Sequence, residues 1–186
     1  LVHRKTIDES GILLKASRAD ENTEFVRASD IWFRPAQYAN APDGTLYIMD
    51  MYREVIEHPA SLPPLIKEHL DLTSGRDRGR IYRVLPDGFK QRALPRLDEA
   101  DSTELVLTLD HPNGWHQETA ARLLYERQDP NAVPALRVLL VKGKTPQGRI
   151  RALYALNSQG ALTPHDVLAA LKDESPKVRE HAIRHA

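Results

Sequence analysis

The fold of this sequence is decided by residues 149–156, which read RIRALYAL. The larger apolar side chains in this stretch fall three and four positions apart, at Ile150, Leu153, Tyr154 and Leu156. This spacing brings them onto one face of an α-helix. It predicts a helix that packs a single apolar stripe against a neighbouring element.

The same pattern recurs before and after this stretch. Three motifs come into register when the chain is aligned with itself, 32 and then 30 residues apart: Gln117-x-x-Ala120, Arg149-x-x-Ala152 and Arg179-x-x-Ala182. A period this short and regular is typical of helix pairs stacked in a solenoid. The alanines allow the helices to approach closely.

Start signals locate the individual helices. Asp101 with Glu104 forms a capping-box pattern, and Thr145, Thr163 and Ser175 each precede a proline, which suits the first helical position. Six helices are predicted, near residues 102–109, 115–127, 131–141, 147–158, 164–171 and 177–185. They are expected to form three hairpins.

The first 90 residues instead contain short strand-like runs bounded by turn residues. These runs are 1–7, 12–16, 24–28, 35–39, 45–51 and 80–85. Residues 45–50 (TLYIMD) are nearly all apolar, which predicts a central strand covered on both faces. The preceding Pro42-Asp43-Gly44 predicts a tight turn. Residues 80–84 alternate between polar and apolar, as in a strand with one exposed face.

A long polar excursion separates the last two strands. It runs from Glu57 to Arg78, contains several prolines and is predicted to hold a short helix over 64–70. Loops of this length are uncommon in compact domains and often carry function.

Composition excludes several classes of protein. The chain is 41% hydrophobic and 28% charged, as in a globular protein, and its 26 basic and 26 acidic residues cancel, which argues against a nucleic-acid partner. No stretch approaches the roughly 18 apolar residues of a membrane span. There are no cysteines, so disulfides, thiolate zinc sites and covalent haem attachment have no ligands in this sequence.

The ends of the sequence suggest a segment of a longer protein. It begins at Leu1 rather than methionine, and its last apolar helix pattern is still running at Ala186. We expect two domains, residues 1–95 and 96–186.

Four runs carry a resemblance to a known family: 32–35 (WFRP), 41–53 (APDGTLYIMDMYR), 55–59 (VIEHP) and 75–83 (GRDRGRIYR). With the helical repeats that follow, they resemble the membrane-bound dehydrogenase domain proteins of planctomycetes and verrucomicrobia. The β-propeller of that family is similar to the glucose/sorbosone dehydrogenase and NHL types.

The resemblance implies an α+β fold in two parts. Residues 1–95 would be the C-terminal blades of an antiparallel β-propeller, and residues 96–186 an all-α HEAT-like solenoid of three helix pairs. It also implies a periplasmic or exported protein whose remaining blades, further repeats and c-type cytochrome domain lie elsewhere in the full chain. Pyrroloquinoline quinone and haem c are implied as cofactors of that full-length protein, with none held by this segment.

Two functions follow from this interpretation. The first is a fragment of a propeller-type sugar or alcohol dehydrogenase that passes electrons to a c-type cytochrome and is inactive by itself. The alternative is a non-catalytic propeller and HEAT binding module for a protein or a polysaccharide.

The strongest candidate site is a cluster of cations with a single acid, comprising Arg76, Asp77, Arg78, Arg80 and Arg83. Guanidinium groups bind carboxylates in bidentate fashion, so the cluster suits a substrate carboxylate, a quinone's acids or a haem propionate. The alternative is a solvated strand edge on which Arg76 and Arg78 pair with nearby acids.

Other candidates depend on residues that the fold has to bring together. Arg34, lodged between Phe33 and Pro35, is predicted to pair with Asp50. His58 and His69 flank the excursion and, with Asp50, are candidates for acid/base chemistry, or are structural.

The remaining patterns favour structural interpretations. His181 and His185 lie one helical turn apart but lack the glutamate of a zinc-protease helix. Asp43 belongs to a turn, although with Asp50 it would suit calcium. The aromatic side chains, which suit either a flat ligand or the core, are Trp32, Phe33, Tyr47, Tyr52 and Tyr82. No metal site is predicted.

Overall fold

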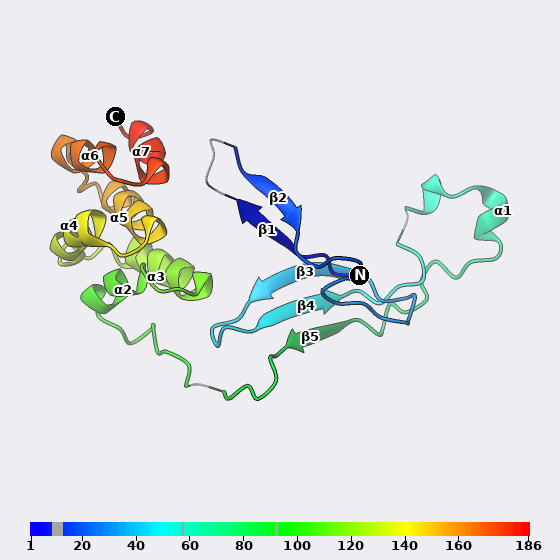
Figure 1. Ribbon diagram of the computed structural model, residues 1–186. Coiled ribbons are helices and arrows are strands. Elements are labelled where there is room, and N and C mark those ends of the chain that lie inside the picture. The colour runs from blue at the N-terminus through cyan, green and yellow to red at the C-terminus, as the bar shows by residue number, and fades with distance from the viewer. Residues whose placement is uncertain (9–12, 57, 92) are drawn as a thin grey trace. The chain divides into compact units, whose positions relative to one another are not determined.

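The computed structural model describes residues 1–8, 13–56, 58–91 and 93–186 (Figure 1). Two predicted features begin outside these residues, the strand at Ile12 and the excursion at Glu57. The chain divides into two compact units, residues 1–39 with 45–89, and residues 40–44 with 90–186. Each unit is described by itself below.

The first unit contains two small antiparallel sheets. Strands β1 (Lys5–Asp8) and β2 (Lys15–Arg18) pair along their whole length. The second sheet has the order β3–β4–β5, formed by β3 (Pro35–Asn40), β4 (Leu46–Asp50) and β5 (Arg80–Val84). In this sheet Leu46 lies opposite Val84, and Asp50 lies opposite Arg80.

The predicted central strand is β4, and its central position is confirmed. The prediction that both of its faces are covered is wrong. Ile48 is buried against Val2 and Phe33, whereas Tyr47 and Met49 are 37% and 43% exposed. Because successive side chains of a strand point to opposite faces, a single covering layer buries only every second residue.

The predicted strand over 24–28 is reduced to one bridge. Val26 exchanges backbone hydrogen bonds with Val2, at 2.7 and 3.3 Å, and lies outside the named strands. Both valines contribute to the small core of the unit around Phe33 and Ile48.

The predicted fold class, propeller blades followed by a HEAT-like solenoid, is wrong. A propeller blade is a four-stranded antiparallel sheet, whereas the described residues form one sheet of two strands and one of three. Short alternating strands and Pro-Asp-Gly turns are compatible with small antiparallel sheets of many kinds, so they do not specify a blade. The sequence period, likewise, determines how neighbouring helices pair but does not make them a solenoid.

The excursion between β4 and β5 contains little regular structure. It holds a 3-10 helix, η1 (Pro59–Ser61), and α1 (Pro64–Lys67), which is shorter than the predicted helix over 64–70. None of the α1 side chains is buried. Burial of α1 side chains therefore contributes little to the stability of this segment.

The second unit contains the six predicted helices, each within two residues of its expected ends. They are α2 (Ser102–Thr108), α3 (Gly114–Arg127), α4 (Ala132–Lys142), α5 (Pro146–Ser158), α6 (Pro164–Leu171) and α7 (Pro176–Ile183). The capping box of Asp101 with Glu104 is present, and the hydroxyls of Thr145 and Thr163 cap α5 and α6. The hydroxyl of Ser175 makes no such bond.

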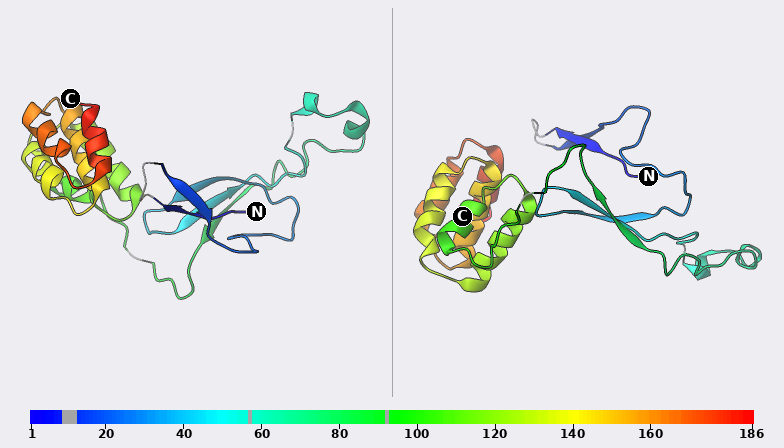
Figure 2. Two further views of the ribbon diagram at one scale, coloured as in Figure 1. Left: turned by 45° about the horizontal axis from the view of Figure 1, so that its top comes forward. Right: turned by 90° about the horizontal axis from the view of Figure 1, so that it is seen from below.

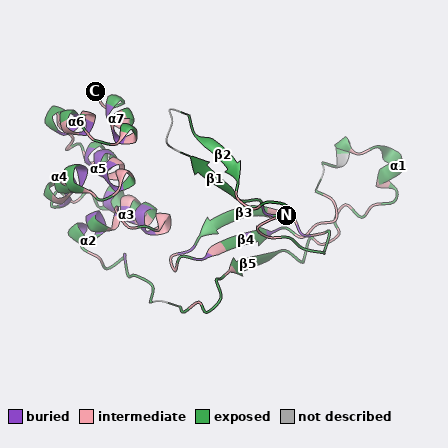
Figure 3. Cartoon of the chain, in the orientation of Figure 1, coloured by how far each residue is buried: buried purple, intermediate pink, exposed green. Residues whose placement is uncertain are grey.

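These helices form two layers around one core (Figure 2). Helices α2, α4 and α6 lie side by side in one layer, and α3, α5 and α7 in the other. Buried residues concentrate on the faces where the layers meet, as the purple ribbon segments in Figure 3 show. None of the helices that the structure describes is long and apolar enough to cross a membrane.

The repeated motif has a repeated hydrogen bond. Gln117 donates to the carbonyl of His111 (2.6 Å), Arg149 to that of Gly143 (2.7 Å), and Arg179 to that of Asp173 (2.7 Å). Each bond spans six residues and ties the start of a helix to the loop before it. The alanines Ala120, Ala152 and Ala182 are fully buried. The predicted register of the three motifs is confirmed.

The β3–β4 turn belongs to the helical unit. Gly44 has φ +86° and donates from its backbone to Ala41 (3.0 Å), which confirms the predicted tight turn. Asn113 donates to the carbonyl of Ala41 (2.8 Å), and Nε2 of His116 lies 2.7 Å from that of Pro42.

Candidate functional site

The segment that precedes β5 is a succession of tight turns. The carboxylate of Asp71 accepts from the backbone N–H and the hydroxyl of Thr73, at 2.9 and 2.8 Å. Further along, Arg76 donates from its backbone to Thr73 (3.1 Å), and Arg78 to Gly75 (3.0 Å). The hydroxyl and the amide of Thr73 lower the pKa of Asp71, because both donate to the ionised carboxylate.

Gly75 holds these turns against the backbone of Tyr52. Its φ is +82°, and a Cβ at this position would overlap the carbonyl oxygen of Tyr52. Only glycine satisfies both conditions without strain. The side chain of Arg53 adds a second link by donating to the carbonyl of Thr73 (3.1 Å).

Aromatic and charged groups meet around Tyr52. Its hydroxyl donates to Asp30 (2.7 Å), which also accepts from the backbone N–H of Trp32 (2.9 Å). The Trp32 and Tyr52 rings lie 5.7 Å apart, and the guanidinium of Arg80 lies 3.8 Å from the centre of the Tyr52 ring. This last geometry is a cation–π contact.

The hydrogen bonds in this cluster shift three pKa values. Donation from the Trp32 amide, then from the Tyr52 hydroxyl, lowers the pKa of Asp30, and the same bond from Tyr52 raises the pKa of Tyr52. Arg80 donates to the hydroxyl of Tyr82 (3.3 Å), which raises the pKa of Arg80. Asp30 therefore stays ionised and Arg80 stays protonated at neutral pH.

A hollow of about 460 Å³ lies beside this cluster. It is lined by Trp32, Asp71, Thr73, Ser74, Gly75, Arg76, Asp77 and Arg78. Within the part of the chain that the structure describes, the guanidinium groups of Arg76 and Arg78 form no ion pair. The charge of Arg76 nevertheless contributes to lowering the pKa of Asp71.

The charge around the hollow is mixed, with an excess of cations. Arg53 donates to Thr73 and Arg80 donates to the carbonyl of Arg78 (3.2 Å), so both reach residues of the lining. Four guanidinium groups thus accompany the two carboxylates of Asp71 and Asp77. Such a set can bind both hydroxyl groups and an anion.

Arg34 lies outside this hollow and has a structural role. Its guanidinium donates to the carbonyls of Ile31, Phe33 (3.3 Å) and Glu54 (3.1 Å). The predicted pairing of its side chain with Asp50 is wrong, because the backbone N–H of Arg34, not the guanidinium, donates to Asp50 (2.7 Å). Arg34 thereby joins the segment before β3 to the segment after β4.

Asp50 is buried at the end of β4, only 1% exposed. One carboxylate oxygen, Oδ1, accepts from the backbone of Arg34 and of Tyr52 (2.9 Å). The other, Oδ2, has no hydrogen-bond partner among the described residues. Asp50 therefore fixes the backbone that carries Tyr52 but does not line the hollow.

The structure does not bring the two candidate histidines together. Nδ1 of His58 accepts from the backbone of Ala60 (3.1 Å) and caps η1. His69 is exposed beyond α1. No hydrogen bond or ring contact joins His58, His69 and Asp50, all of which are described. Nor do the described residues include a group of three or more His, Asp or Glu that could hold a metal ion.

His181 and His185 both pack on one tyrosine. Their rings lie edge-on to Tyr154, with centres 5.6 and 4.9 Å away, and Nδ1 of His181 lies 3.0 Å from the tyrosine hydroxyl. This contact accounts for their helical spacing. The aromatic Phe33 is likewise a core residue, 5.9 Å from the Tyr82 ring.

Two parts of the site were not predicted. Asp30 carries no local sequence signal, because its partners Tyr52 and Arg80 lie far from it along the chain. Asp71-x-Thr73 carries a usable signal, since an Asp two residues before a threonine favours a side-chain turn.

A comparison with known protein families finds a similarity over the region that contains this site. Residues 1–88 match the model of a family described as a domain of unknown function (DUF7133), slightly less than half of the chain. All the residues that line the hollow lie within this similarity. No curated protein and no solved structure matches the chain.

Proposed function

We propose that the first unit is a non-catalytic binding module for an acidic saccharide, such as a chain of uronic acids. The observation that carries this proposal is that Arg76 and Arg78, which form no ion pair with any described residue, share one hollow with the half-buried indole of Trp32.

The chemistry of the lining supports this class of ligand. The face of an indole suits the C–H face of a sugar ring, because both are flat and weakly polar. Guanidinium groups bind a carboxylate in bidentate fashion. The carboxylate of Asp77 and the hydroxyls of Thr73 and Ser74 can exchange hydrogen bonds with sugar hydroxyls.

Calorimetric titration with trigalacturonic acid tests the proposal, with neutral maltotriose as the matched ligand. We expect the acidic trisaccharide to bind more tightly, and the Arg76→Gln/Arg78→Gln variant to lose about tenfold in affinity because two charge-assisted contacts are removed. Trp32→Ala should weaken the binding of both trisaccharides.

Arg27→Gln/Lys15→Gln is the matched control, because it removes the same charge from exposed positions outside the hollow. Equal binding of the two trisaccharides, or an unchanged affinity in the Arg76→Gln/Arg78→Gln variant, would refute the proposal.

The dehydrogenase function stays a prediction. The carboxylates of pyrroloquinoline quinone belong to the class of groups that Arg76 and Arg78 would bind, whereas covalent haem has no cysteine in this chain. Reduction of an artificial electron acceptor by the full-length protein, given a sugar and the quinone, would support it. Absence of turnover over a broad sugar panel would count against it.

A further inference from the structure

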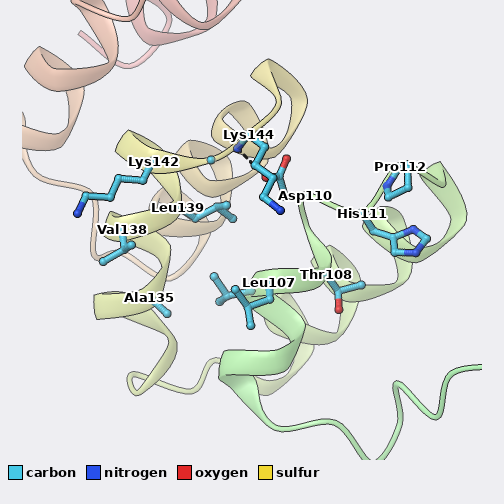
Figure 4. A pocket seen from close by; sticks show the side chains of 12 residues that line it. Leu107, Thr108, Asp110, His111, Pro112, Ala135, Val138, Leu139, Lys142 and Lys144 are labelled. Carbon is cyan, nitrogen blue, oxygen red and sulfur yellow. Dashed lines mark hydrogen bonds between the residues drawn. The ribbon is translucent and has the colours of Figure 1, made fainter.

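The helical unit has a hollow of about 710 Å³ between α2 and α4. Val106 and Leu139, which are nearly inaccessible at 1% and 8% exposure, form its floor. Leu107 and Val138 form its walls. Figure 4 shows Leu107, Val138 and Leu139 around the space between the two helices.

The walls of this hollow are unusually exposed for apolar side chains. Leu107 is 69% exposed and Val138 is 58% exposed, although they come from different helices and line the same space. Val141, one turn along α4 from Val138, is also 64% exposed. Contiguous apolar surface of this kind marks interaction sites more often than scattered apolar residues do.

The end of the hollow is positively charged. Lys142 and Lys144 line it, and no described residue forms an ion pair with either amine. Asp110 lies close by, but its carboxylate already accepts from the backbone N–H groups of Lys144 (2.7 Å) and Thr145 (3.1 Å) and from the Thr145 hydroxyl. The carboxylate is thereby held at the start of α5, and the two lysine amines against this one carboxylate leave an excess of one positive charge at this end of the hollow.

We infer that this hollow binds a short peptide segment in which one or two apolar side chains are flanked by acidic residues. The apolar side chains would lie between Leu107 and Val138, and the acids would reach Lys142 and Lys144. The hollow has an apolar floor against which side chains can pack, and it is open to solvent between its exposed walls. It therefore suits a peptide that lies across α2 and α4. This inference is independent of the saccharide site, because every residue involved lies in the helical unit.

Fluorescence anisotropy with a labelled Glu-Glu-Leu-Leu-Glu-Glu peptide tests the inference on the whole chain. The matched probes are the same peptide with serines in place of the leucines and with lysines in place of the glutamates. We expect the acidic, leucine-containing peptide to bind in the micromolar to millimolar range and to weaken as salt is added. Both matched probes should bind at least about tenfold more weakly.

Two variants locate the binding. Lys142→Glu/Lys144→Glu should lower the affinity for the acidic peptide about tenfold or more, because it replaces charge attraction to the peptide by repulsion. Val138→Ser should weaken it without unfolding the chain, because Val138 is mostly exposed. Lys67→Glu/Lys90→Glu makes the same change of net charge outside the hollow and should leave binding unchanged.

Three results would overturn the inference: no binding of the acidic peptide, equal binding of the serine probe, or unchanged binding in Lys142→Glu/Lys144→Glu with folding confirmed by circular dichroism. Tighter binding of laurate that displaces the peptide would assign the hollow to an amphiphile instead.

Discussion

At the scale of single residues, the Tyr52 region shows how one side chain can organise several others. Tyr52 has φ +50°, donates to Asp30 and lies under the guanidinium of Arg80. Its backbone is in turn fixed by the buried carboxylate of Asp50. The candidate saccharide site therefore depends on residues that do not line it.

Tyr52→Phe should raise the pKa of Asp30 toward its ordinary value of 3.8, because the hydroxyl that donates to the ionised carboxylate is lost. The bond favours ionised Asp30 and protonated Tyr52. Its contribution to stability is therefore complete between the ordinary pKa values of 3.8 and 10.0 and is lost as the pH falls through the lowered pKa of Asp30 or rises through the raised pKa of Tyr52.

A carboxyl NMR titration of Asp30 measures this effect directly. The Trp32 amide still donates in the variant, so the shift should be partial. Tyr47→Phe is the control, because Tyr47 makes no contact with Asp30. An unchanged titration of Asp30 in Tyr52→Phe would contradict the assigned hydrogen bond.

Gly75→Ala should destabilise the first unit by about 2 kcal/mol or more, because it combines a positive φ with a clash against the backbone of Tyr52. Gly88→Ala is a matched control. It has a similar φ of +72° but nothing within 4 Å of the added carbon, so it should cost about 1 kcal/mol.

Urea unfolding followed by Trp32 fluorescence in a Trp115→Phe background measures both variants. Equal losses of unfolding free energy in Gly75→Ala and Gly88→Ala would show that the clash with Tyr52 contributes nothing. Gly75→Ala should also weaken the binding of trigalacturonic acid, since Arg76 and Arg78 follow Gly75 in this turn.

At the scale of elements, the helical repeats are joined by polar side chains as well as by the core. Arg149 is 5% exposed and bonds to Asp173 through two nitrogens, at 2.7 and 3.0 Å, while a third nitrogen bonds to the loop before α5. Since Asp173 lies between α6 and α7, this ion pair connects consecutive helix pairs.

Asp173→Ala should destabilise the helical unit by about 3 kcal/mol, because it leaves the buried guanidinium of Arg149 without its main partner. Glu126→Ala removes an exposed partner of Arg122 and should cost only about 0.3 kcal/mol. Urea unfolding followed by Trp115 fluorescence, with Trp32 replaced by Phe, measures the difference. Similar losses in the two variants would mean that burial of the Arg149 pair has no energetic consequence.

At the scale of the whole molecule, the two units have very different cores. Among the described residues, the core of the first unit contains the buried side chains of Val2, Phe33 and Ile48, with four partly buried neighbours. The core of the second extends through all six of its helices. Since apolar burial is the main stabilising contribution to folding, the two units should differ in stability.

Unfolding of the chain should therefore occur in two transitions. Each unit has one tryptophan, Trp32 in the first and Trp115 in the second. We expect Trp32 fluorescence, recorded with Trp115→Phe, to change at a lower urea concentration than Trp115 fluorescence, recorded with Trp32→Phe. Coincident midpoints would show that the units unfold as one.

Local sequence signals determined the helices, their caps, the β3–β4 turn and the central position of β4. These features depend on neighbours a few residues apart, or on a period that repeats along the chain. The register of Gln117, Arg149 and Arg179 was visible for the same reason, and each of these residues makes the same bond to its own loop.

Only the tertiary structure decided how many strands each sheet contains, that Arg34 bonds to backbone carbonyls, and that Asp30, Tyr52 and Arg80 meet. The propeller prediction failed at this level, because strand patterns specify which residues alternate but not which strands pair. Side chains 20 or more residues apart come together only through packing and sheet register, and the local sequence pattern determines neither of them. The hollow beside Trp32 is the product of those long-range contacts.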